Sequence, residues 1–313
     1  MPSSASQPEP GFPPLLVICG PTATGKTALS LALAERINGT EIISADSRQV
    51  YRGMDIGTAK VSALDRARIR HHGLDLVEPD ERFTAADYVA HAHGALVGIA
   101  SRRGVAVLVG GTGLYIRAIA RGLPLEETGS DATLRAELEE RLAGEGLHVM
   151  VARLRSQAPR IAARTDLANP RRVVRALERV QLRGDELPPA PRGYPGPIAW
   201  LGLDVERATN DRWLAERARW QFENGLLEEA TALRARYDPT LPPFSAMGYR
   251  EAFAVLDGEM TVEEAIKIDA RRTRQFARRQ RTWFRNEAGV EWLDAQANAL
   301  QRALEVGHRL VGS

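Results

Sequence analysis

The stretch GPTATGKT, residues 20–27, decides the fold. It fits the phosphate-loop pattern GxxxxGK[ST] at every fixed position, follows an apolar run and opens a segment of helical periodicity. Gly20 and Gly25 permit backbone angles at which successive N–H groups surround an anion, and the helix N-terminus adds partial positive charge. Lys26 would bring a full charge to the phosphate oxygens, and Thr27 would offer its hydroxyl to Mg²⁺. The stretch therefore predicts a polyphosphate-binding loop.

A phosphate loop does not identify its ligand or the bond that breaks. Three classes of protein remain open at this point. The first is a small-molecule or nucleoside kinase that uses ATP. The second is a switch or motor driven by a nucleoside triphosphate. The third is a transferase that binds a diphosphate as its leaving group.

Apolar strands that alternate with helical segments surround this loop. Such alternation favours an α/β fold, with a parallel sheet covered by helices on both faces. The expected strands are residues 13–20, 40–47, 104–111 and 198–205, and the expected helices are residues 26–37, 85–100 and a segment from residue 114.

Residues 122–196 interrupt this rhythm with helix-like blocks and close with the turn-rich segment PPAPRGYPGP. We interpret them as a helical domain inserted into a discontinuous core of residues 14–121 and 197–313. Residues 1–13, rich in Ser and Pro, are expected to form a flexible tail.

The segment after residue 205 is predicted to be helical. N-cap candidates are Thr209, Asn210 and Asp211, and Leu214, Ala218 and Phe222 form an apolar stripe at helical spacing. A capping box that begins at Thr261 opens a long basic helix, which is expected to run to about Arg285.

Composition places the chain among ordinary globular proteins. It has 313 residues, of which 44% are hydrophobic and 26% are charged. No apolar run is long enough to cross a bilayer, and residues 1–12 lack the layout of a signal peptide. The single cysteine, Cys19, is expected to be a buried core thiol and fits a reducing compartment. We therefore expect a cytoplasmic protein, and nothing demands more than a monomer.

The net charge of +2 conceals two basic stretches. Residues 267–285 hold eight Lys or Arg against one acid, and a second basic stretch covers residues 160–183. Basic segments that face one side would attract nucleic acid, whereas a solvated helix face is the alternative interpretation.

Several further segments, in the right order, resemble the signatures of the tRNA dimethylallyltransferase (isopentenyltransferase) family. They are ISADSRQVYRGMDIGTAK (43–60), VGGTGLYIRA (109–118), NPRRVVRALE (169–178), MGYRE (247–251) and TRQFARRQRTWFR (273–285). The resemblance extends from about Leu15 to Leu293. It implies a P-loop-kinase-like core and a helical insertion that grips the tRNA anticodon arm.

The resemblance also implies the chemistry. The exocyclic amine of an adenine beside the anticodon attacks the allylic carbon of dimethylallyl diphosphate, and pyrophosphate leaves. Asp46 resembles the family's general base, with binding of Mg²⁺ through water or helix capping as its alternatives. Lys26, Mg²⁺ at Thr27 and Arg217 would stabilise the leaving group. Arg217 could also be a surface ion-pair partner, and Trp213 departs from the arginine that many relatives carry nearby.

The same resemblance assigns the ligand contacts. The diphosphate would be bound by Gly20, Pro21, Thr22, Ala23, Thr24, Gly25, Lys26 and Thr27. The tRNA path would be lined by Asp46, Ser47, Arg48, Gln49, Thr112, Arg171, Arg172, Val173, Val174, Arg175, Ser245, Ala246, Met247, Gly248, Tyr249 and Arg250. Arg48 and Gln49 replace small or apolar residues that are common in relatives.

Aromatic and histidine side chains have structural alternatives. Tyr249 could stack on a base or pack in the core. Phe276, Trp283 and Phe284 are expected to pack the long basic helix on the core. The pair His71 and His72, without carboxylate or Cys partners nearby, is expected to lie in a turn rather than to bind metal.

The main alternative to prenyl transfer is a P-loop kinase. A kinase would need a lid that supplies arginines, and the basic stretch of residues 160–183 could imitate such a lid. A nucleotide-hydrolysing RNA-binding switch would need a second acidic strand end. The segment VLVGGTG (107–113) has glycines there, which argues against the switch.

Overall fold

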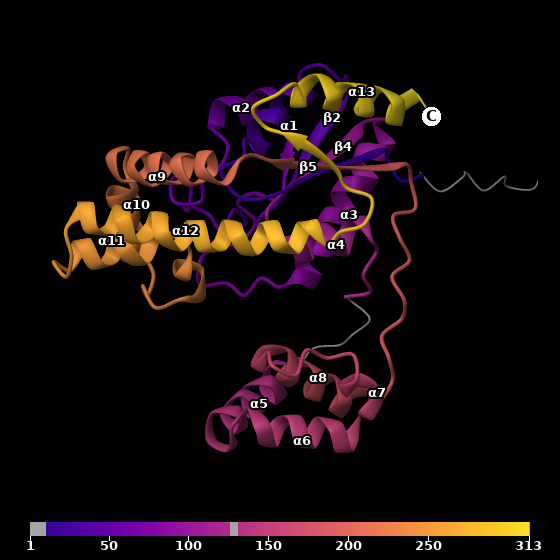
Figure 1. Cartoon of the computed structure of the whole chain (residues 1–313), viewed down its shortest axis with the longest axis vertical. Coiled ribbons are helices and arrows are strands. Elements are labelled where there is room, and N and C mark those ends of the chain that lie inside the picture. Colours follow the sequence, from indigo (N-terminus) through magenta and orange to yellow (C-terminus); the bar gives the residue numbers. More distant parts are fainter. Residues whose placement is uncertain (1–10, 126–130, 313) are drawn as a thin grey trace, which may run out of the picture. The chain divides into compact units, whose positions relative to one another are not determined.

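A computed structural model describes residues 11–125 and 131–312 of the chain. Its contacts divide into two compact units, a core of residues 1–122 and 193–313 and a helical unit of residues 123–192 (Figure 1). Residues 1–10 of the expected tail lie outside the described part. Phe12 packs edge-to-face against Tyr194, whose hydroxyl donates a 2.6 Å hydrogen bond to the carbonyl of Pro13.

The core is built on a parallel sheet, which confirms the predicted α/β class. The strand order is β3-β2-β4-β1-β5-β6. The strands are β1 (Leu15–Cys19), β2 (Thr40–Ala45), β3 (His71–His72), β4 (Val105–Gly110), β5 (Ile198–Asp204) and β6 (Glu291–Asp294). The four predicted strands correspond to β1, β2, β4 and β5. The short edge strands β3 and β6 were not predicted.

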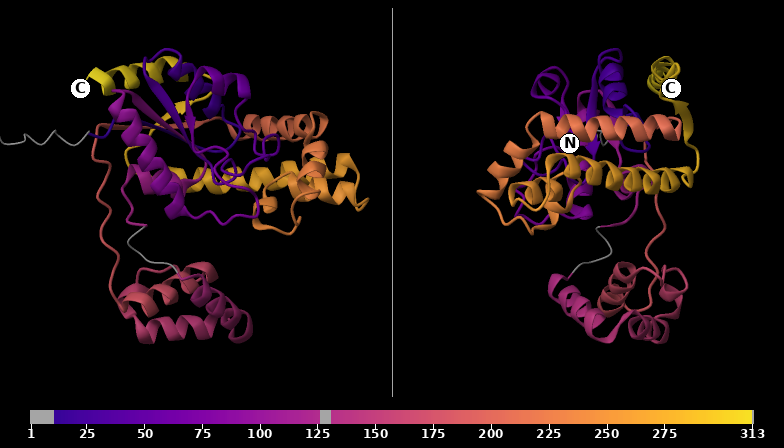
Figure 2. Two further views of the ribbon diagram at one scale, coloured as in Figure 1. Left: turned by 180° about the vertical axis from the view of Figure 1, so that it is seen from behind. Right: turned by 60° about the vertical axis from the view of Figure 1, so that its left-hand side comes forward.

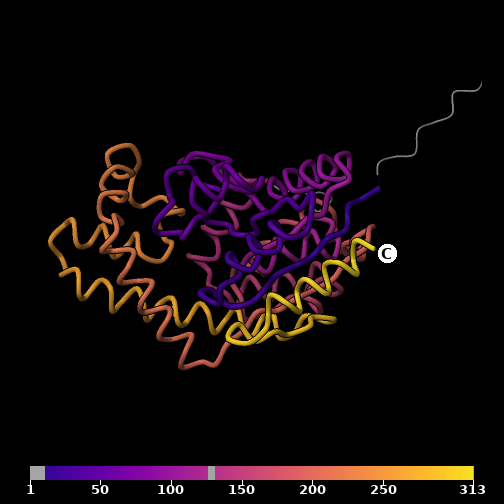
Figure 3. The backbone as a smooth tube through the Cα atoms, turned by 90° about the horizontal axis from the view of Figure 1, so that it is seen from above, coloured from indigo at the N-terminus to yellow at the C-terminus, as the bar shows by residue number. Residues whose placement is uncertain are grey.

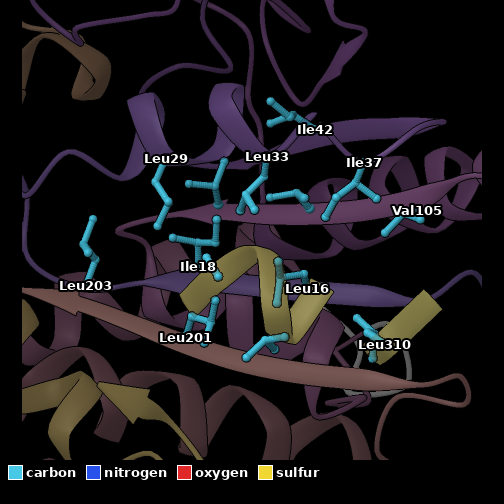
Figure 4. Packing of buried hydrophobic residues seen from close by; sticks show 14 of the residues in the cluster. Leu16, Ile18, Leu29, Leu33, Ile37, Ile42, Val105, Leu201, Leu203 and Leu310 are labelled. Atoms are coloured by element: carbon cyan, nitrogen blue, oxygen red, sulfur yellow. The ribbon is translucent and has the colours of Figure 1, made fainter. Parts of the chain in front are cut away.

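Helices cover both faces of this sheet. On one face lie α1 (Lys26–Ala34) and α13 (Ala299–Gly312), and on the other lie α3 (Ala85–Ser101) and α4 (Gly113–Ala120). Figure 4 shows Leu29 and Leu33 of α1 facing Leu16 and Ile18 of β1, all of them buried. The last helix, α13, contacts β1 and α1, the first elements of the chain. Figure 3 shows the C-terminal helix, in yellow, running beside this N-terminal part of the backbone, in indigo. Cys19 is fully buried, as expected, and burial raises the pKa of its thiol to about 12.

A second layer of helices extends the core beyond the sheet. Its long members, α9 (Arg207–Glu223) and α12 (Val262–Arg285), pack side by side (Figure 2). The shorter elements of this layer are α10 (Leu226–Arg234), the 3₁₀ helix η2 (Pro242–Ser245) and α11 (Tyr249–Leu256), whereas the short helix α2 (Ala63–Arg68) lies between β2 and β3 in the chain. The predicted apolar stripe is confirmed, because Leu214, Ala218 and Phe222 are buried.

The N-terminal ends of α9 and α12 can be compared with the predicted caps. The capping box at Thr261 is confirmed, since its side chain accepts from the N–H of Glu264 and the Glu264 carboxylate accepts from the N–H of Thr261. The N-cap of α9 was predicted too late in the chain. The helix begins at Arg207, so Thr209 and Asn210 lie inside its first turn and are buried.

The helical unit forms a small core of its own. It contains α5 (Ala132–Glu145), α6 (Leu147–Gln157), α7 (Pro159–Ala162) and α8 (Pro170–Arg183). Buried apolar side chains from these helices, including Leu138, Met150, Leu154 and Leu177, pack together. The fully buried Glu178 carboxylate accepts two hydrogen bonds from Arg135 and one from the N–H of Asp131, which ties α8 to the start of α5.

The adjacent histidines lie in β3 rather than in a turn, so that prediction was wrong. His72 Nε2 lies 2.7 Å from a Glu41 carboxylate oxygen, and this contact joins the edge strand to β2. None of the helices within residues 11–125 and 131–312 combines the length and apolar character that a bilayer-spanning segment needs.

Candidate active site at the carboxyl edge of the sheet

The predicted reactive residues meet where the parallel strands end. The phosphate loop follows β1, Asp46 follows β2, and Thr112 follows β4 after one glycine, Gly111. Because parallel strands all end at one edge of the sheet, these segments converge there. Lys26, Thr27, Asp46 and Arg217 line one shared cavity.

The phosphate loop contains residues with positive φ, and its glycines permit this backbone conformation. Gly20 has φ +136°, and a Cβ there would lie 2.2 Å from the carbonyl oxygen of Leu203. Gly25 precedes α1 with φ +83°, while Ala23 takes φ +58°, which is unusual for a residue with a side chain. The hydroxyl of Thr24 donates to the Pro21 carbonyl at 3.0 Å and closes the loop internally.

Two cations of the site come from different elements. Lys26, at the start of α1, donates from Nζ to the Pro21 carbonyl at 2.5 Å. Arg217 reaches the loop from α9 and donates from Nη1 to Thr22 Oγ1 at 3.0 Å. Burial and the neighbouring Arg217 guanidinium lower the pKa of Lys26 to about 8, and burial also lowers the pKa of Arg217. The loop contact rules out a mere surface ion pair as the role of Arg217.

A buried acid lies behind Arg217. Asp269 of α12 is 2% exposed and accepts from the hydroxyl of Thr273 at 3.3 Å. Burial, with the Glu251 carboxylate nearby, raises the pKa of Asp269 to about 6. The Asp269 carboxylate and Asp46 both favour the charged form of Arg217 electrostatically.

Asp46 is held with its carboxylate toward the cavity. Its Oδ1 accepts the backbone N–H of Arg48 at 2.8 Å, and no other hydrogen bond reaches this carboxylate from the described residues. The next backbone N–H, of Ser47, donates to Thr112 Oγ1 at 3.0 Å, which links the ends of β2 and β4. A half-buried carboxylate so placed can accept a proton from a ligand in the cavity.

The side chains of Arg48 and Gln49 bind other parts of the core. The Arg48 guanidinium donates to the Pro242 carbonyl at 2.9 Å and to Ser245 Oγ at 3.0 Å. Gln49 accepts from Ser44 Oγ at 2.8 Å and donates to the Thr58 carbonyl at 3.2 Å. Both side chains therefore hold neighbouring loops in place.

Residues 245–250, predicted to contact tRNA, include both buried and exposed side chains. Tyr249 is fully buried and donates from its hydroxyl to Glu229 Oε1 at 2.6 Å, so it packs in the core and base stacking is excluded. Ala246 and Gly248 are buried as well, Met247 is half-buried, and Ser245 and Arg250 are exposed. Ser245 and Arg250, and in part Met247, offer side chains to a ligand.

A similar division runs through α8 of the helical unit. Val173 and Val174 are 0% and 2% exposed and pack in the core of that unit, so assigning them as tRNA contacts through their side chains was wrong. Arg171, Arg172 and Arg175 are all exposed. Arg172 pairs with Asp166 at 3.3 Å, and Arg175 pairs with Glu178.

Apolar side chains form part of the remaining cavity wall, beside polar ones that include Ser44, Gln49 and His71. Ile42, Val61, Leu74 and Val109 line it on the sheet side. Phe276 of α12, which was predicted to pack the helix on the core, is half-buried and also lines this cavity. Trp283 packs against Gly113, and Phe284 is fully buried, as predicted.

Two side chains at the phosphate loop were missed by the sequence interpretation. Gln280 of α12 accepts the N–H of Thr22 at 2.8 Å, and Asn210 of α9 donates to the Thr22 carbonyl at 3.1 Å. Gln280 lies within the quoted segment 273–285, but its type gives no signal for a role at the loop. Asn210 was interpreted as a helix cap.

The long basic helix α12 uses several of its charges internally. Arg281 and Arg285 bind the Asp204 carboxylate at 2.7 and 3.0 Å, and Arg272 binds Glu251. Other side chains border an open groove, namely Lys267, Ile268, Arg271, Arg274, Gln275 and Arg278.

The residues of the site fit a metal that is held mainly by its substrate. The described residues contain no group of three or more His, Cys, Asp or Glu side chains that could hold an ion. Thr27 instead offers one hydroxyl beside the anion-binding loop. Mg²⁺ keeps several waters and is usually bound through one or two protein ligands and substrate phosphates, which this arrangement suits.

Comparisons with known proteins agree with this geometry. The family model described as IPP transferase matches residues 49–287, and the model described as Isopentenyl transferase matches residues 13–75. A tRNA dimethylallyltransferase of Anaeromyxobacter sp. is 46% identical over 302 residues, which cover 93% of this chain and 97% of the relative. A tRNA dimethylallyltransferase of Geobacter metallireducens is 44% identical over 286 residues, covering 90% and 92%.

A solved structure shares the fold. The full-length tRNA isopentenylpyrophosphate transferase from Bacillus halodurans aligns with a TM-score of 0.69 at 38% sequence identity. The alignment covers 95% of each chain.

Proposed function

The chain belongs to the IPP transferase family, and from this premise we propose the reaction of its active site. It transfers a dimethylallyl group from dimethylallyl diphosphate to the exocyclic amine of the adenine on the 3′ side of a tRNA anticodon, and it releases pyrophosphate. The enzyme is a prenyl-transferring transferase that modifies tRNA.

One observation carries the proposal. A single cavity combines the phosphate loop with its two cations, a carboxylate at the end of β2, and several apolar side chains. The loop and cations suit a diphosphate, the apolar side chains suit a short prenyl group, and Asp46 suits the amine that attacks it.

The proposed chemistry is a displacement at the allylic carbon. The bond between that carbon and the diphosphate oxygen breaks, and its electron pair leaves with pyrophosphate. The adenine amine forms the new carbon–nitrogen bond. Its proton goes to the carboxylate of Asp46, a residue that lines the cavity. An amine whose lone pair is delocalised into the ring gains from such a base.

The leaving group is stabilised by preformed positive groups. The loop amides, Lys26 and Arg217 lie where negative charge develops on pyrophosphate, so they stabilise the transition state more than the ground state. We propose that Thr27 holds Mg²⁺ together with the diphosphate. When bound, the ion neutralises charge on the phosphate oxygens.

The tRNA contacts are proposed from exposed, basic side chains. Arg171, Arg172 and Arg175 of α8 lie on the surface of the helical unit and suit the phosphates of an anticodon stem-loop. Ser245 and Arg250 of the core are exposed as well. Because the target adenine must reach Asp46, we propose that it leaves its stack, as bases do in other modifying enzymes.

The kinase alternative has less support. It shares the phosphate loop, but the matched family model is that of IPP transferases and the relatives are tRNA dimethylallyltransferases by name. The strand end after β4 carries Gly110 and Gly111 in place of an acid, which also disfavours a nucleotide-hydrolysing switch.

Mass spectrometry of one modified nucleoside tests the proposal. Purified protein would be incubated with tRNA, Mg²⁺ and dimethylallyl diphosphate, and the tRNA digested to oligonucleotides. We expect one added dimethylallyl group on the adenosine that follows the anticodon. An unmodified anticodon loop, or the group at another position, would contradict the proposal.

A further inference from the structure

Thr22, inside the phosphate loop, is bound at each of its polar groups. Its N–H donates to Gln280 Oε1 at 2.8 Å, and its carbonyl accepts from Asn210 Nδ2 at 3.1 Å. Its hydroxyl oxygen accepts from Arg217 at 3.0 Å. All three partners come from the helix pair α9 and α12, so this pair fixes the loop from outside.

Asn210 compensates the least favourable part of the loop. It is 1% exposed, and its amide also lies 3.4 Å from the carbonyl of Ala23. Ala23 holds a left-handed backbone angle that costs free energy unless its surroundings enforce it. Carbonyl oxygens that pointed at a diphosphate would repel it. Asn210 binds two of them, which leaves loop amides to face the anion.

Gln280 connects the loop to the neighbouring strand end. While its Oε1 accepts from Thr22, its Nε2 donates to the carbonyl of Gly111 at 2.9 Å. The side chain is 6% exposed, so each bond is shielded from water. One neutral carboxamide thereby joins the segments after β1 and β4 without adding negative charge beside the phosphates.

Gly111 leaves the space that this bridge needs. A Cβ at this position would lie 2.2 Å from Gln280 Nε2. Its φ is not in the left-handed region, so the backbone itself would accept alanine. The requirement for glycine at residue 111 is therefore set by the Gln280 carboxamide.

We infer that Gln280 and Asn210 are positioning residues that hold the phosphate loop in its diphosphate-binding conformation. The inference rests on the proposed function, because it assumes that the loop binds the diphosphate of the donor. Neither residue needs to touch the ligand. A loop that is already ordered binds without the cost of fixing its backbone on each encounter.

A double-mutant cycle between Gly111→Ala and Gln280→Ala tests the bridge. Isothermal titration calorimetry would measure binding of inorganic pyrophosphate with Mg²⁺. Each single variant should weaken binding by about tenfold, the size expected when a shielded hydrogen bond is lost. Gly111→Ala should have almost no further effect in the Gln280→Ala background, because the added methyl group then displaces nothing.

Controls separate positioning from general damage. Gln301→Ala removes an exposed glutamine on α13 and should leave pyrophosphate binding unchanged. In the cycle variants, the affinity for tRNA should stay near that of the unmodified protein, and each variant should still unfold in a single cooperative transition. Asn210→Ala is an independent variant that should also weaken pyrophosphate binding by about tenfold.

Several results would overturn the inference. They are unchanged pyrophosphate affinity in Gln280→Ala and Asn210→Ala, fully additive losses in the cycle, or an equal loss of tRNA affinity. If a cycle variant does not fold, the result with Asn210→Ala decides. Failure of the unmodified protein to bind pyrophosphate would instead overturn the proposed function, and this inference with it.

Discussion

The phosphate loop and helix α8 both present the cations that prediction assigned to ligands, but they hold them differently. Lys26 and Arg217 are hydrogen-bonded to the loop and their pKa values are lowered by burial. Arg171, Arg172 and Arg175 extend from the surface of a separately packed helical unit. Fixed, desolvated charges suit the stabilisation of one transition state, whereas exposed charges suit a polyanion that is bound through many weak contacts.

The largest effect should follow from the loss of the base. Asp46→Asn should lower the single-turnover rate of transfer by about 10²–10⁴ at saturating tRNA and donor, because the amide cannot take the proton. The affinity for tRNA should change little. A comparable loss of tRNA affinity would instead make Asp46 a docking residue. The core would then bind RNA as helix α8 is proposed to do.

Arg217 tests the fixed cations of the core. Arg217→Ala should reduce kcat by about 10²–10³, the cost of removing one preorganised donor from a developing anion. Arg212→Ala, on the same helix but exposed, is the matched control and should have little effect. Equal effects of the two variants would show that the position of the charge beside the loop is unimportant.

The ionisation of Lys26 gives a pH dependence that the exposed arginines lack. The pKa of Lys26 is lowered to about 8, so this side chain loses its positive charge as the pH rises through that value. The kcat/KM for the donor should then fall by about tenfold per pH unit above 8, since it reports free-enzyme ionisations.

Lys26→Arg is the control for this prediction. Its guanidinium stays charged, so the decline above pH 8 should disappear even if the absolute rate is lower. A decline that persists in Lys26→Arg would assign it to another group.

The smallest effect is expected on the helical unit. Arg171→Ala with Arg175→Ala should weaken tRNA binding by about tenfold. The slope of the logarithm of the binding constant against the logarithm of the salt concentration should become shallower by roughly one to two, which is one unit or less for each lost phosphate contact. The donor KM should not change. Arg141→Ala with Arg155→Ala removes two exposed arginines from α5 and α6 of the same unit. A slope that falls as much in this control pair would show that α8 has no special role.

The comparison also shows what the sequence could predict. The phosphate loop and β1, β2, β4 and β5 were identified because their signals are local, a spaced glycine pattern and apolar runs. The edge strands β3 and β6 have two and four residues, too few for a clear pattern.

The supporting contacts of the site could not be predicted in this way. Gln280 meets Thr22 from 258 residues away, and no local pattern encodes that distance. The resemblance of residues 169–178 to a family signature marked a whole segment as RNA-binding. Only the packing of Val173 and Val174 in the helical core shows which side chains of that segment face inward.

The central claim is that the phosphate loop binds the diphosphate of a prenyl donor rather than a nucleoside triphosphate. A reaction that contains tRNA, Mg²⁺, dimethylallyl diphosphate and labelled ATP together tests it most directly, with pyrophosphate and prenylated adenosine counted in the same sample. We predict one pyrophosphate released for each prenylated adenosine, with the ATP intact. Consumption of ATP without prenylated adenosine would contradict the account.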